Sequence, residues 1–333
     1  MQWIVSPLLE WYYIHRRMLP WREEQTAYHV WISEIMLQQT RIEAVKRYYD
    51  RFTKALPTIE ALANVEEDKL LKLWEGLGYY NRARNLQKAA KTIMEKHQGE
   101  MPKDYATLLT LPGIGEYTAG AIASIVHNEK VPAVDGNVLR VIARVRADDR
   151  NVLLPATKKE VTQDLTNMMP EEAGMFNEAL MELGETICIA KTQPLCEKCP
   201  LAFQCEARRL GKEQELPVRE KKKGRKIEHK QVYIIRCGKE MAILKREEGL
   251  LQGLYELPNS EKPVEEQLQE WELEAESIEK KGNYKHIFTH KEWHMQVYAV
   301  QVKQKHTGFT WVEESRIRKE YPMPTAFLKA FKV

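Results

Sequence analysis

The sequence contains no long apolar run and no strong excess of charge of one sign. None of its apolar segments reaches the roughly 18 residues that a membrane-spanning helix needs, so we expect no membrane partner. The opening stretch, MQWIVSPLLEWYY, lacks a basic segment and a small-residue cleavage site, so we expect no signal peptide and a cytoplasmic location. The net charge of +3 permits binding to nucleic acid without demonstrating it. The 333 residues fit a soluble globular protein of two or three domains.

Cysteine is scarce, and four of the five cysteines lie within one short segment with the spacing C-x7-C-x2-C-x5-C: Cys188, Cys196, Cys199 and Cys205. A chain of this length without a secretion signal does not point to a disulfide framework. Four neighbouring thiolates suit a tetrahedral zinc ion or an iron–sulfur cluster. Cys237 stands alone in a strand-like run, and we interpret it as an ordinary buried residue.

Strand-like alternation is missing from residues 1–216, which are predicted to be almost entirely helical. Proline and glycine separate the periodic segments, and we expect helices at residues 28–52, 59–74, 83–97, 116–126, 138–146, 158–168 and 171–187. Residues 217–230 are rich in Lys and Arg and poor in apolar side chains, which is the composition of a linker.

Beyond this linker the pattern changes to runs rich in Val, Ile and Tyr, which are typical of strands. We expect strands at residues 231–237, 240–246 and 293–302, a helix at 264–278 and a short helix near 325–331. The predicted fold class is therefore a mainly α domain, residues 1–216, followed by a separate α+β domain, residues 231–333.

A Pro/Gly turn, LPGIG, joins two apolar helical patterns within about residues 105–127. Gly113 and Gly115 allow backbone amides to approach a phosphate without a Cβ in the way. The helix that follows adds unpaired N–H donors and a partial positive charge at its N-terminus. The turn is therefore a predicted phosphate site, and the structural alternative is an ordinary αα-hairpin turn.

Two carboxylates lie in settings that are expected to push their pKa values apart. Glu34 has apolar helical neighbours such as Trp31, and lost hydration would raise its pKa above the usual value of about 4.3. Asp135 is placed to cap a helix, where backbone donors and the helix dipole would lower its pKa. A protonated and an ionised carboxyl together can break a glycosidic bond. The alternatives are a Glu34 that faces solvent or pairs with Arg41, and an Asp135 that only caps.

Aromatic residues recur beside turn glycines and basic side chains. Trp21 precedes Arg22, and Tyr79 lies in the glycine-rich segment 76–82. Such groups can stack on a flipped base or enter a duplex, although core packing is the usual role of aromatic residues.

Taken in order, these motifs give residues 1–216 a resemblance to the iron–sulfur branch of the helix-hairpin-helix DNA glycosylases. Within that superfamily the sequence most resembles the adenine DNA glycosylases of the MutY type. The motifs that carry the resemblance are LPWR, SEIMLQQT, WEGLGYYNRARNL, LPGIGEYTAG, AVDGNV, FNEALMELG and the four cysteines.

The resemblance implies a role for each matching position. Glu34 would protonate adenine N7, and Asp135 would stabilise the positively charged sugar or bind it covalently for a time. Tyr117 and Asn137 would orient these catalytic groups. The other implied roles are an adenine pocket of Trp21, Arg22 and Glu178, duplex insertion by Gln39 and Tyr79, backbone binding by Leu111, Gly113 and Gly115, and a 4Fe–4S cluster on Cys188, Cys196, Cys199 and Cys205 in the loop 188–205.

Two departures from relatives bear on these roles. The family usually has six residues in the first cysteine gap, whereas this sequence has seven, which we expect a loop to accommodate; zinc stays an alternative. Endonuclease III-type relatives carry a lysine nucleophile in the hairpin motif, where this sequence has Tyr117. Without that amine, imine chemistry has no obvious agent, so we predict a monofunctional glycosylase.

The C-terminal domain resembles the Nudix-like domain of adenine glycosylases but lacks the paired glutamates of the hydrolase motif. The run Phe288-Thr289-His290 resembles the loop, usually Phe-Ser-His, that inspects 8-oxoguanine, and Thr289 keeps the hydroxyl. The structural alternative is a strand-end turn with a solvated histidine.

The resemblance implies double-stranded DNA with adenine opposite 8-oxoguanine or guanine as the partner. We expect a monomer, associated with the nucleoid if the source is bacterial. Two other readings stay open: a bifunctional endonuclease III-like pyrimidine glycosylase and lyase, and a non-catalytic iron–sulfur protein that binds DNA.

Overall fold

The structure is a computed structural model, and it describes residues 1–220 and 224–333. It divides into two compact units, Met1–Asn64 with Arg84–Lys221, and Val65–Ala83 with Lys222–Val333. The domain boundaries expected from sequence stay predictions, since this division groups one helical segment of the N-terminal part with the C-terminal part. Three residues of the predicted linker, 221–223, lie outside the described residues.

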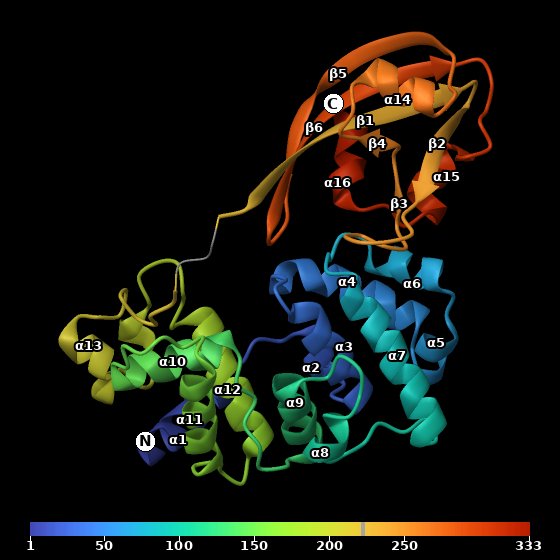
Figure 1. Ribbon diagram of the computed structural model, residues 1–333. Coiled ribbons are helices and arrows are strands. Elements are labelled where there is room, and N and C mark those ends of the chain that lie inside the picture. The colour runs from blue at the N-terminus through green and yellow to red at the C-terminus, as the bar shows by residue number, and fades with distance from the viewer. Residues whose placement is uncertain (221–223) are drawn as a thin grey trace. The chain divides into compact units, whose positions relative to one another are not determined.

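The first unit is built from helices, as the sequence predicts (Figure 1). Its helices are α1 (Val5–His15), α2 (Pro20–Glu23), α3 (Ala27–Leu37), α4 (Ile42–Ala55), α5 (Ile59–Asn64), α7 (Asn81–Lys96, whose first turn belongs to the second unit), α8 (Tyr105–Leu108), α9 (Glu116–His127), α10 (Gly136–Arg146), α11 (Pro155–Thr166), α12 (Ala173–Thr186) and α13 (Glu206–Leu210). Among the described helices of both units, none is long and apolar enough to cross a bilayer.

Two helical predictions need correction. The single helix expected at residues 28–52 is two helices, α3 and α4, and the one expected at residues 59–74 is α5 followed by α6 (Glu67–Trp74). Helix α1 was not predicted. Gln38 leaves helical geometry with ψ 110°, and Gln39 adopts a left-handed φ of 58°. The polar run Gln38-Gln39-Thr40 carries no proline or glycine, so the usual markers of a helix end are absent there.

Helix α12 lies at the centre of the first unit and packs against α1, α9 and α10, while α3 packs against α9. The apolar core joins residues of α1, α10, α11 and α12. Two glycines allow close approach of neighbouring segments. A Cβ on Gly120 of α9 would lie 2.6 Å from the carbonyl oxygen of Pro132, in the loop before α10, and one on Gly184 of α12 would lie 2.6 Å from Cβ of Asn137 on α10. These contacts fix the start of α10 against its neighbours.

The second unit contains a seven-stranded sheet in which β1 and β6 run parallel and the main order is β3-β2-β1-β6-β5 (Figure 1). Strand β4 pairs with β1, and β7 pairs with β2. The elements are β1 (Lys226–Cys237), β2 (Glu240–Lys245), β3 (Tyr255–Glu256), β4 (Asn259–Ser260), β5 (Ala275–Ile287), β6 (Lys291–Val302), β7 (Thr310–Glu313), α14 (Val264–Glu270), α15 (Glu314–Glu320), α16 (Thr325–Leu328) and, from the N-terminal half of the chain, α6 (Glu67–Trp74).

Apolar clusters cover both faces of this sheet. Val232 and Trp293 pack with Phe327 of α16 on one face, and Tyr233 and Val300 pack in the cluster that holds Leu268 of α14 on the other. The unit is therefore an α+β domain with helices on both sides of its sheet, as expected for its class.

The helix expected at residues 264–278 ends at residue 270, and the strand β5 was not predicted. Strand β5 lies at the edge of the sheet, most of its residues are exposed, and five of its 13 residues are Glu or Lys. Charged side chains on an edge strand discourage pairing with other chains, and they also remove the apolar alternation that reveals a strand in sequence.

Candidate active site

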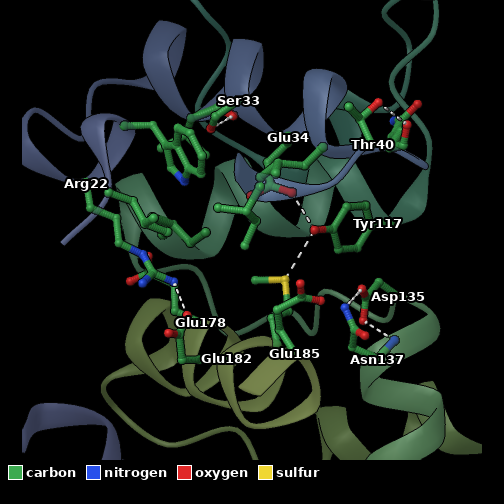
Figure 2. A pocket seen from close by; sticks show the side chains of 18 of the residues that line it. Arg22, Ser33, Glu34, Thr40, Tyr117, Asp135, Asn137, Glu178, Glu182 and Glu185 are labelled. Atoms are coloured by element: carbon green, nitrogen blue, oxygen red, sulfur yellow. Dashed lines mark hydrogen bonds and ion pairs between the residues drawn. The ribbon is translucent and has the colours of Figure 1, made fainter. Parts of the chain in front are cut away.

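A cavity of about 560 Å³ lies in the helical unit among residues of α2, α3, α9, α10 and α12 (Figure 2). This volume is within the usual range for ligand sites, roughly 300–1,000 Å³. The structure brings together eight residues of the predicted site along its wall: Trp21, Arg22, Glu34, Gln39, Tyr117, Asp135, Asn137 and Glu178. They come from four separate parts of the sequence, so their meeting in one cavity is a property of the fold.

Glu34 is buried on α3, with 7% of its surface exposed, and its side chain faces the cavity (Figure 2). Burial raises the pKa of Glu34 from its ordinary 4.5 to about 7. The nearby carboxylates of Asp135 and Glu178 also raise this pKa, whereas Tyr117 and Arg22 lower it. The predicted rise is confirmed, and the solvent-facing alternative does not hold.

The hydroxyl of Tyr117 donates a hydrogen bond to Oε2 of Glu34 and contacts the sulfur of Met181 at 3.1 Å (Figure 2). Tyr117 lies in the first turn of α9, directly after the predicted phosphate-binding turn. Burial and the two carboxylates raise the pKa of Tyr117 well above 10. The phenol therefore stays protonated at neutral pH and acts as a donor that fixes the Glu34 carboxyl.

Asp135 is the N-cap of α10, as the sequence predicts. Its Oδ1 accepts hydrogen bonds from the backbone N–H groups of Asn137 and Val138, both at 2.8 Å, and its Oδ2 accepts from Nδ2 of Asn137 at 2.9 Å. Asn137 in turn accepts from the Arg140 guanidinium at 2.8 Å. The carboxylate is thus held in one orientation at the edge of the cavity (Figure 2).

The predicted direction of the Asp135 shift is wrong, because the pKa of Asp135 is raised rather than lowered. Burial beside the cavity is the largest cause. The backbone donors of Val138 and Asn137 and the charge of Arg140 act in the opposite direction and offset only part of it. Sequence showed the helix start and its donors but gave no sign that the first turn of α10 is buried.

A network of guanidinium and carboxylate groups forms one wall of the cavity. Nε of Arg22 lies 3.2 Å from Oε1 of Glu178, and its Nη2 lies 3.0 Å from Oε2 of Glu182. Arg17 also pairs with Glu182 at 2.5 Å, and Gln25 donates to Glu178 at 3.0 Å. Sequence reasoning missed Arg17 and Glu182, although Glu182 follows Glu178 by one helical turn and so shares its face.

The predicted backbone-binding turn lies elsewhere in the same unit and does not line the cavity. Gly113 has a left-handed φ of 76°, and a Cβ there would lie 2.6 Å from Cβ of Asn85, so glycine is required. Gly115 caps α9 and is exposed, with no atom within 4 Å of its would-be Cβ. Leu111 is buried beneath the turn and anchors it.

The four clustered cysteines line a separate pocket in the same unit: Cys188, Cys196, Cys199 and Cys205. In the described parts of the chain, no three His, Cys, Asp or Glu side chains are gathered as one metal ion requires. Sulfurs around a single zinc ion would lie about 4 Å apart, because each Zn–S bond is about 2.3 Å. Four cysteines that line one pocket are a donor set that suits either a zinc ion or an iron–sulfur cluster. The seven-residue gap does not prevent Cys188 from lining this pocket with the other three cysteines.

Arginines of α10 connect this pocket to the start of the same helix. Arg140 donates to the carbonyl oxygens of Cys188 and Gly184, both at 2.8 Å, and Arg144 donates to the carbonyl of Cys188 at 3.1 Å. The cysteine loop is therefore tied to the helix that Asp135 caps.

The remaining predicted residues lie in the second unit. The hairpin between β5 and β6 carries Phe288, Thr289 and His290, of which Thr289 and His290 are exposed. Phe288 packs edge-on against Trp293, with ring centroids 4.7 Å apart. Tyr79 donates to or accepts from Oγ1 of Thr289 at 2.7 Å. The structure thus pairs a residue predicted to enter DNA with one predicted to read the lesion.

Comparison with known families matches both parts of the chain. Residues 32–171 match the HhH-GPD superfamily of base excision DNA repair proteins, and residues 231–333 match the NUDIX domain. Among solved structures, a thermostable thymine-DNA glycosylase superposes with a TM-score of 0.57 at 28% identity, covering 63% of this chain and 96% of that one. An endonuclease III trapped covalently on DNA gives 0.54 at 25% identity, with 63% and 96% covered.

Curated relatives extend the similarity over most of the chain. The adenine DNA glycosylase of Mus musculus is 34% identical over 90% of this chain and 70% of its own length. The Arabidopsis thaliana and Homo sapiens proteins of that name are 37% and 42% identical over 76% and 63% of this chain. The chain spans 46% of the former and 40% of the latter, so it covers less than half of either.

Proposed function

The chain belongs to the adenine DNA glycosylase family, and from this membership we propose that it removes adenine mispaired with 8-oxoguanine or guanine by hydrolysing the N-glycosidic bond. The observation that carries the proposal is the position of Glu34 and Asp135 on the wall of one cavity. A flipped nucleotide in that cavity would meet a carboxyl that holds its proton near neutral pH and a second one fixed by three donors.

In the proposed reaction, Glu34 is the general acid that protonates N7 of adenine. Protonation makes the base a better leaving group, and a pKa of about 7 lets Glu34 carry this proton near neutral pH. As the bond breaks, positive charge builds up on the sugar, and the Asp135 carboxylate stabilises it by charge or by a transient bond. The donors from Asn137 and Val138 favour the ionised form that this role needs.

The adenine itself is proposed to bind against the guanidinium–carboxylate wall. Glu178 and Arg22 together offer acceptors and donors that complement the edge of a purine. Trp21 is buried beside them and supplies an apolar surface. Tyr117 fixes Glu34, and Asn137 fixes Asp135, so both act by positioning catalytic groups.

We propose that the enzyme is monofunctional and leaves an abasic site. Tyr117 occupies the hairpin position where lyases of the superfamily carry a lysine, and a phenol cannot form an imine. Arg17 and Arg22 also line the cavity, but a guanidinium stays protonated and is no substitute for an amine nucleophile. A bifunctional enzyme would instead be revealed by a covalent DNA adduct after borohydride reduction.

DNA binding is proposed to use the turn at Leu111–Gly115 and the residues Gln39 and Tyr79. The exposed Gly115 leaves the amides at the start of α9 open to a backbone phosphate. Gln39 and Tyr79 are exposed residues with left-handed φ values of 58° and 48°. Such strain in residues other than glycine is typical of functional positions, and it supports their insertion into the duplex, where each would fill space vacated by a flipped base.

On the opposite strand, Phe288, Thr289 and His290 are proposed to inspect 8-oxoguanine. Packing of Phe288 on Trp293 anchors the hairpin, so the hydroxyl of Thr289 and the imidazole of His290 project from a rigid base. Both side chains can hydrogen-bond to the positions at which 8-oxoguanine differs from guanine.

The four cysteines Cys188, Cys196, Cys199 and Cys205 are proposed to hold a 4Fe–4S cluster, which would order the loop that carries them. The test is the metal content of the purified protein, with about four iron atoms per chain expected and full zinc occupancy without iron contradicting the cluster. We further propose that the protein acts as a monomer in the cytoplasm.

The decisive experiment for the function is single-turnover release of adenine from duplexes that place it opposite 8-oxoguanine, guanine, cytosine or thymine. Release is expected to be fastest opposite 8-oxoguanine and next opposite guanine, and to fall by at least about a hundredfold in Glu34→Gln and Asp135→Asn. Release that survives both substitutions would overturn the catalytic roles. DNA binding without release from any duplex would favour the non-catalytic alternative.

A further inference from the structure

The hydrogen bond between Tyr79 and Thr289 joins residues that are 210 positions apart in the sequence. Both side chains belong to the second unit, although Tyr79 comes from the N-terminal half of the chain. A single hydrogen bond between two exposed side chains contributes little by itself. The geometry of the pair therefore depends on whatever fixes the two segments that carry it.

Side chains at both ends of the segment that carries Tyr79 hydrogen-bond to its backbone. The indole of Trp74 donates to the carbonyl of Gly78 at 3.1 Å, and Nη2 of Arg82 donates to the carbonyls of Leu77 and Gly78, both at 3.1 Å. The Arg82 guanidinium also lies over the ring of Tyr79, 5.6 Å from its centroid. The loop is thus a rigid extension of α6, and the position of α6 decides where Tyr79 lies.

Helix α6 is attached to the C-terminal part of the unit through Asp68. Its Oδ1 pairs with Nζ of Lys245 on β2 at 2.7 Å, and its Oδ2 accepts from the hydroxyl of Tyr255 on β3 at 3.2 Å. Lys245 also lies over the Tyr255 ring, 5.4 Å from its centroid. One acidic side chain therefore engages two neighbouring strands.

The other end of α6 is attached through Lys72 and Glu75. Nζ of Lys72 donates to the carbonyl oxygen of Tyr321 at 3.0 Å, and Oε1 of Glu75 accepts from the backbone N–H of Met323 at 2.8 Å. Lys72 and Glu75 also pair with each other at 2.8 Å, and less than a fifth of each side chain is exposed. Met323 is fully buried, so Glu75 satisfies a backbone donor that has left water.

We propose that Asp68 and Glu75 are positioning residues that attach α6 to the C-terminal part of the second unit. Tyr79 and Thr289 are thereby held together and recognise the base opposite adenine as a pair. The inference deepens the proposed function and rests on it, since the pair has meaning only if the base opposite adenine is inspected. Neither Asp68 nor Glu75 is assigned a contact with DNA. They determine specificity through the residues that they hold in place.

The proposal is tested by exchanging the charges of one ion pair in the full-length protein. Asp68→Lys and Lys245→Asp change the net charge in opposite directions, yet each is expected to lower the preference for 8-oxoguanine over guanine by about tenfold. The double exchange restores an ion pair and is expected to return this preference to within about twofold of the parent. An altered affinity for DNA through charge alone would instead move the two single variants in opposite directions.

A second pair of variants uses the buried backbone donor. Glu75→Gln keeps an oxygen that can accept from Met323 and is expected to preserve the preference, whereas Glu75→Ala removes the acceptor and is expected to lower it. Glu270→Lys disrupts an exposed ion pair with Lys262 in the same unit and serves as the matched control, with no change expected.

Hydrogen exchange of the DNA-free proteins supplies a readout that is independent of activity. Amides of residues 65–83 are expected to exchange faster in both single charge variants and in Glu75→Ala, and at the parental rate in the double exchange. Unchanged exchange together with unchanged preference would overturn the proposal, as would a double exchange that restores neither. If the parent itself does not prefer 8-oxoguanine, the proposed function fails, while the exchange data still decide whether Asp68 and Glu75 attach α6.

Discussion

The phenol of Tyr117 donates a hydrogen bond to the buried carboxyl of Glu34, and this contact lowers the pKa of that carboxyl. The contact opposes burial, because a donor stabilises the ionised carboxylate and lowers its pKa. Burial has the larger effect, so the pKa of Glu34 rises to about 7. Without Tyr117 the pKa of Glu34 would be higher still, and the carboxyl would give up its proton less readily near neutral pH.

The pH dependence of adenine release should report this balance. Because Glu34 must be protonated to act as the acid, single-turnover release is expected to fall tenfold for each pH unit well above about 7. Tyr117→Phe removes the donor, so the falling limb is expected to move to higher pH even though the maximal rate is lower. A falling limb at the same pH in Tyr117→Phe and the parent would contradict the role of the hydrogen bond.

The raised pKa of Glu34 that we propose serves catalysis is expected to lower the stability of the folded protein at high pH. Its pKa rises from 4.5 to about 7 on folding, so its effect on stability becomes less favourable as the pH rises through this range, and the full cost is present above pH 7. Glu34→Gln carries no charge and is expected to be more stable than the parent at pH 8 by about 1–3 kcal/mol. The difference should shrink below pH 5.

Urea denaturation at pH 8 and at pH 5 measures this difference. Glu10→Gln, at an exposed position on α1, is the control and should alter stability equally at the two pH values. If Glu34→Gln is no more stable than the parent at pH 8, burial of the ionised Glu34 carboxylate does not lower the free energy of unfolding, and the prediction fails.

Sequence predicted much of the candidate site, because the motifs that carry it are local. Asp135 and Asn137 lie within one helix start, and Glu34 lies on a helix with apolar neighbours, so spacing and capping rules apply to them directly. The direction of the Asp135 pKa was mispredicted, since burial of a helix start depends on distant segments that no local pattern reveals. Arg17 and Glu182 were missed for the same reason, because their ion pair spans 165 residues.

The second unit was harder to predict. The charged edge strand β5 carries no apolar alternation, and the pairing of α6 with β2 and β3 depends on tertiary contacts alone. The run that contains Thr289 was identified only through its resemblance to a family motif, since the strand β5 that precedes it was not predicted. Sequence therefore gave candidate DNA-contacting residues in this unit, and it gave no sign of Asp68 and Glu75, which we propose position them.

Close packing at Gly184 supports a prediction about a residue with no chemistry of its own. A Cβ at this position would lie 2.6 Å from Cβ of Asn137, whose amide holds Asp135. Gly184→Ala should therefore displace Asn137 and lower the rate of adenine release by about 10- to 100-fold. Overpacking should also cost about 1–3 kcal/mol of stability.

Gly224→Ala provides the control for this substitution, because among the described residues beyond its chain neighbours no atom lies within 4 Å of a Cβ built there. It is expected to leave both the rate and the stability at parental values. A Gly184→Ala protein with parental rates would show that α10 can shift without disturbing the Asp135 carboxylate.

The hairpin that we propose reads the lesion gives a prediction about specificity rather than rate. Thr289 and His290 are exposed, while Phe288 holds the hairpin to the sheet through Trp293. Thr289→Ala with His290→Ala should therefore leave the fold intact and remove side-chain hydrogen bonds to 8-oxoguanine. Release opposite 8-oxoguanine is expected to slow by about tenfold or more, and release opposite guanine should change by less than about twofold.

Single-turnover rates on the two duplexes measure the effect, with Lys281→Ala, on the exposed edge strand, as the control. The ratio of the two rates separates lesion reading from general DNA binding, since a lost phosphate contact slows both duplexes alike. A double variant that still distinguishes 8-oxoguanine from guanine as well as the parent does would locate the reading of the lesion elsewhere in the chain. Because the two side chains extend from a hairpin that packing holds rigid, the loss should come from missing hydrogen bonds, and Thr289→Ser should retain most of the parental ratio.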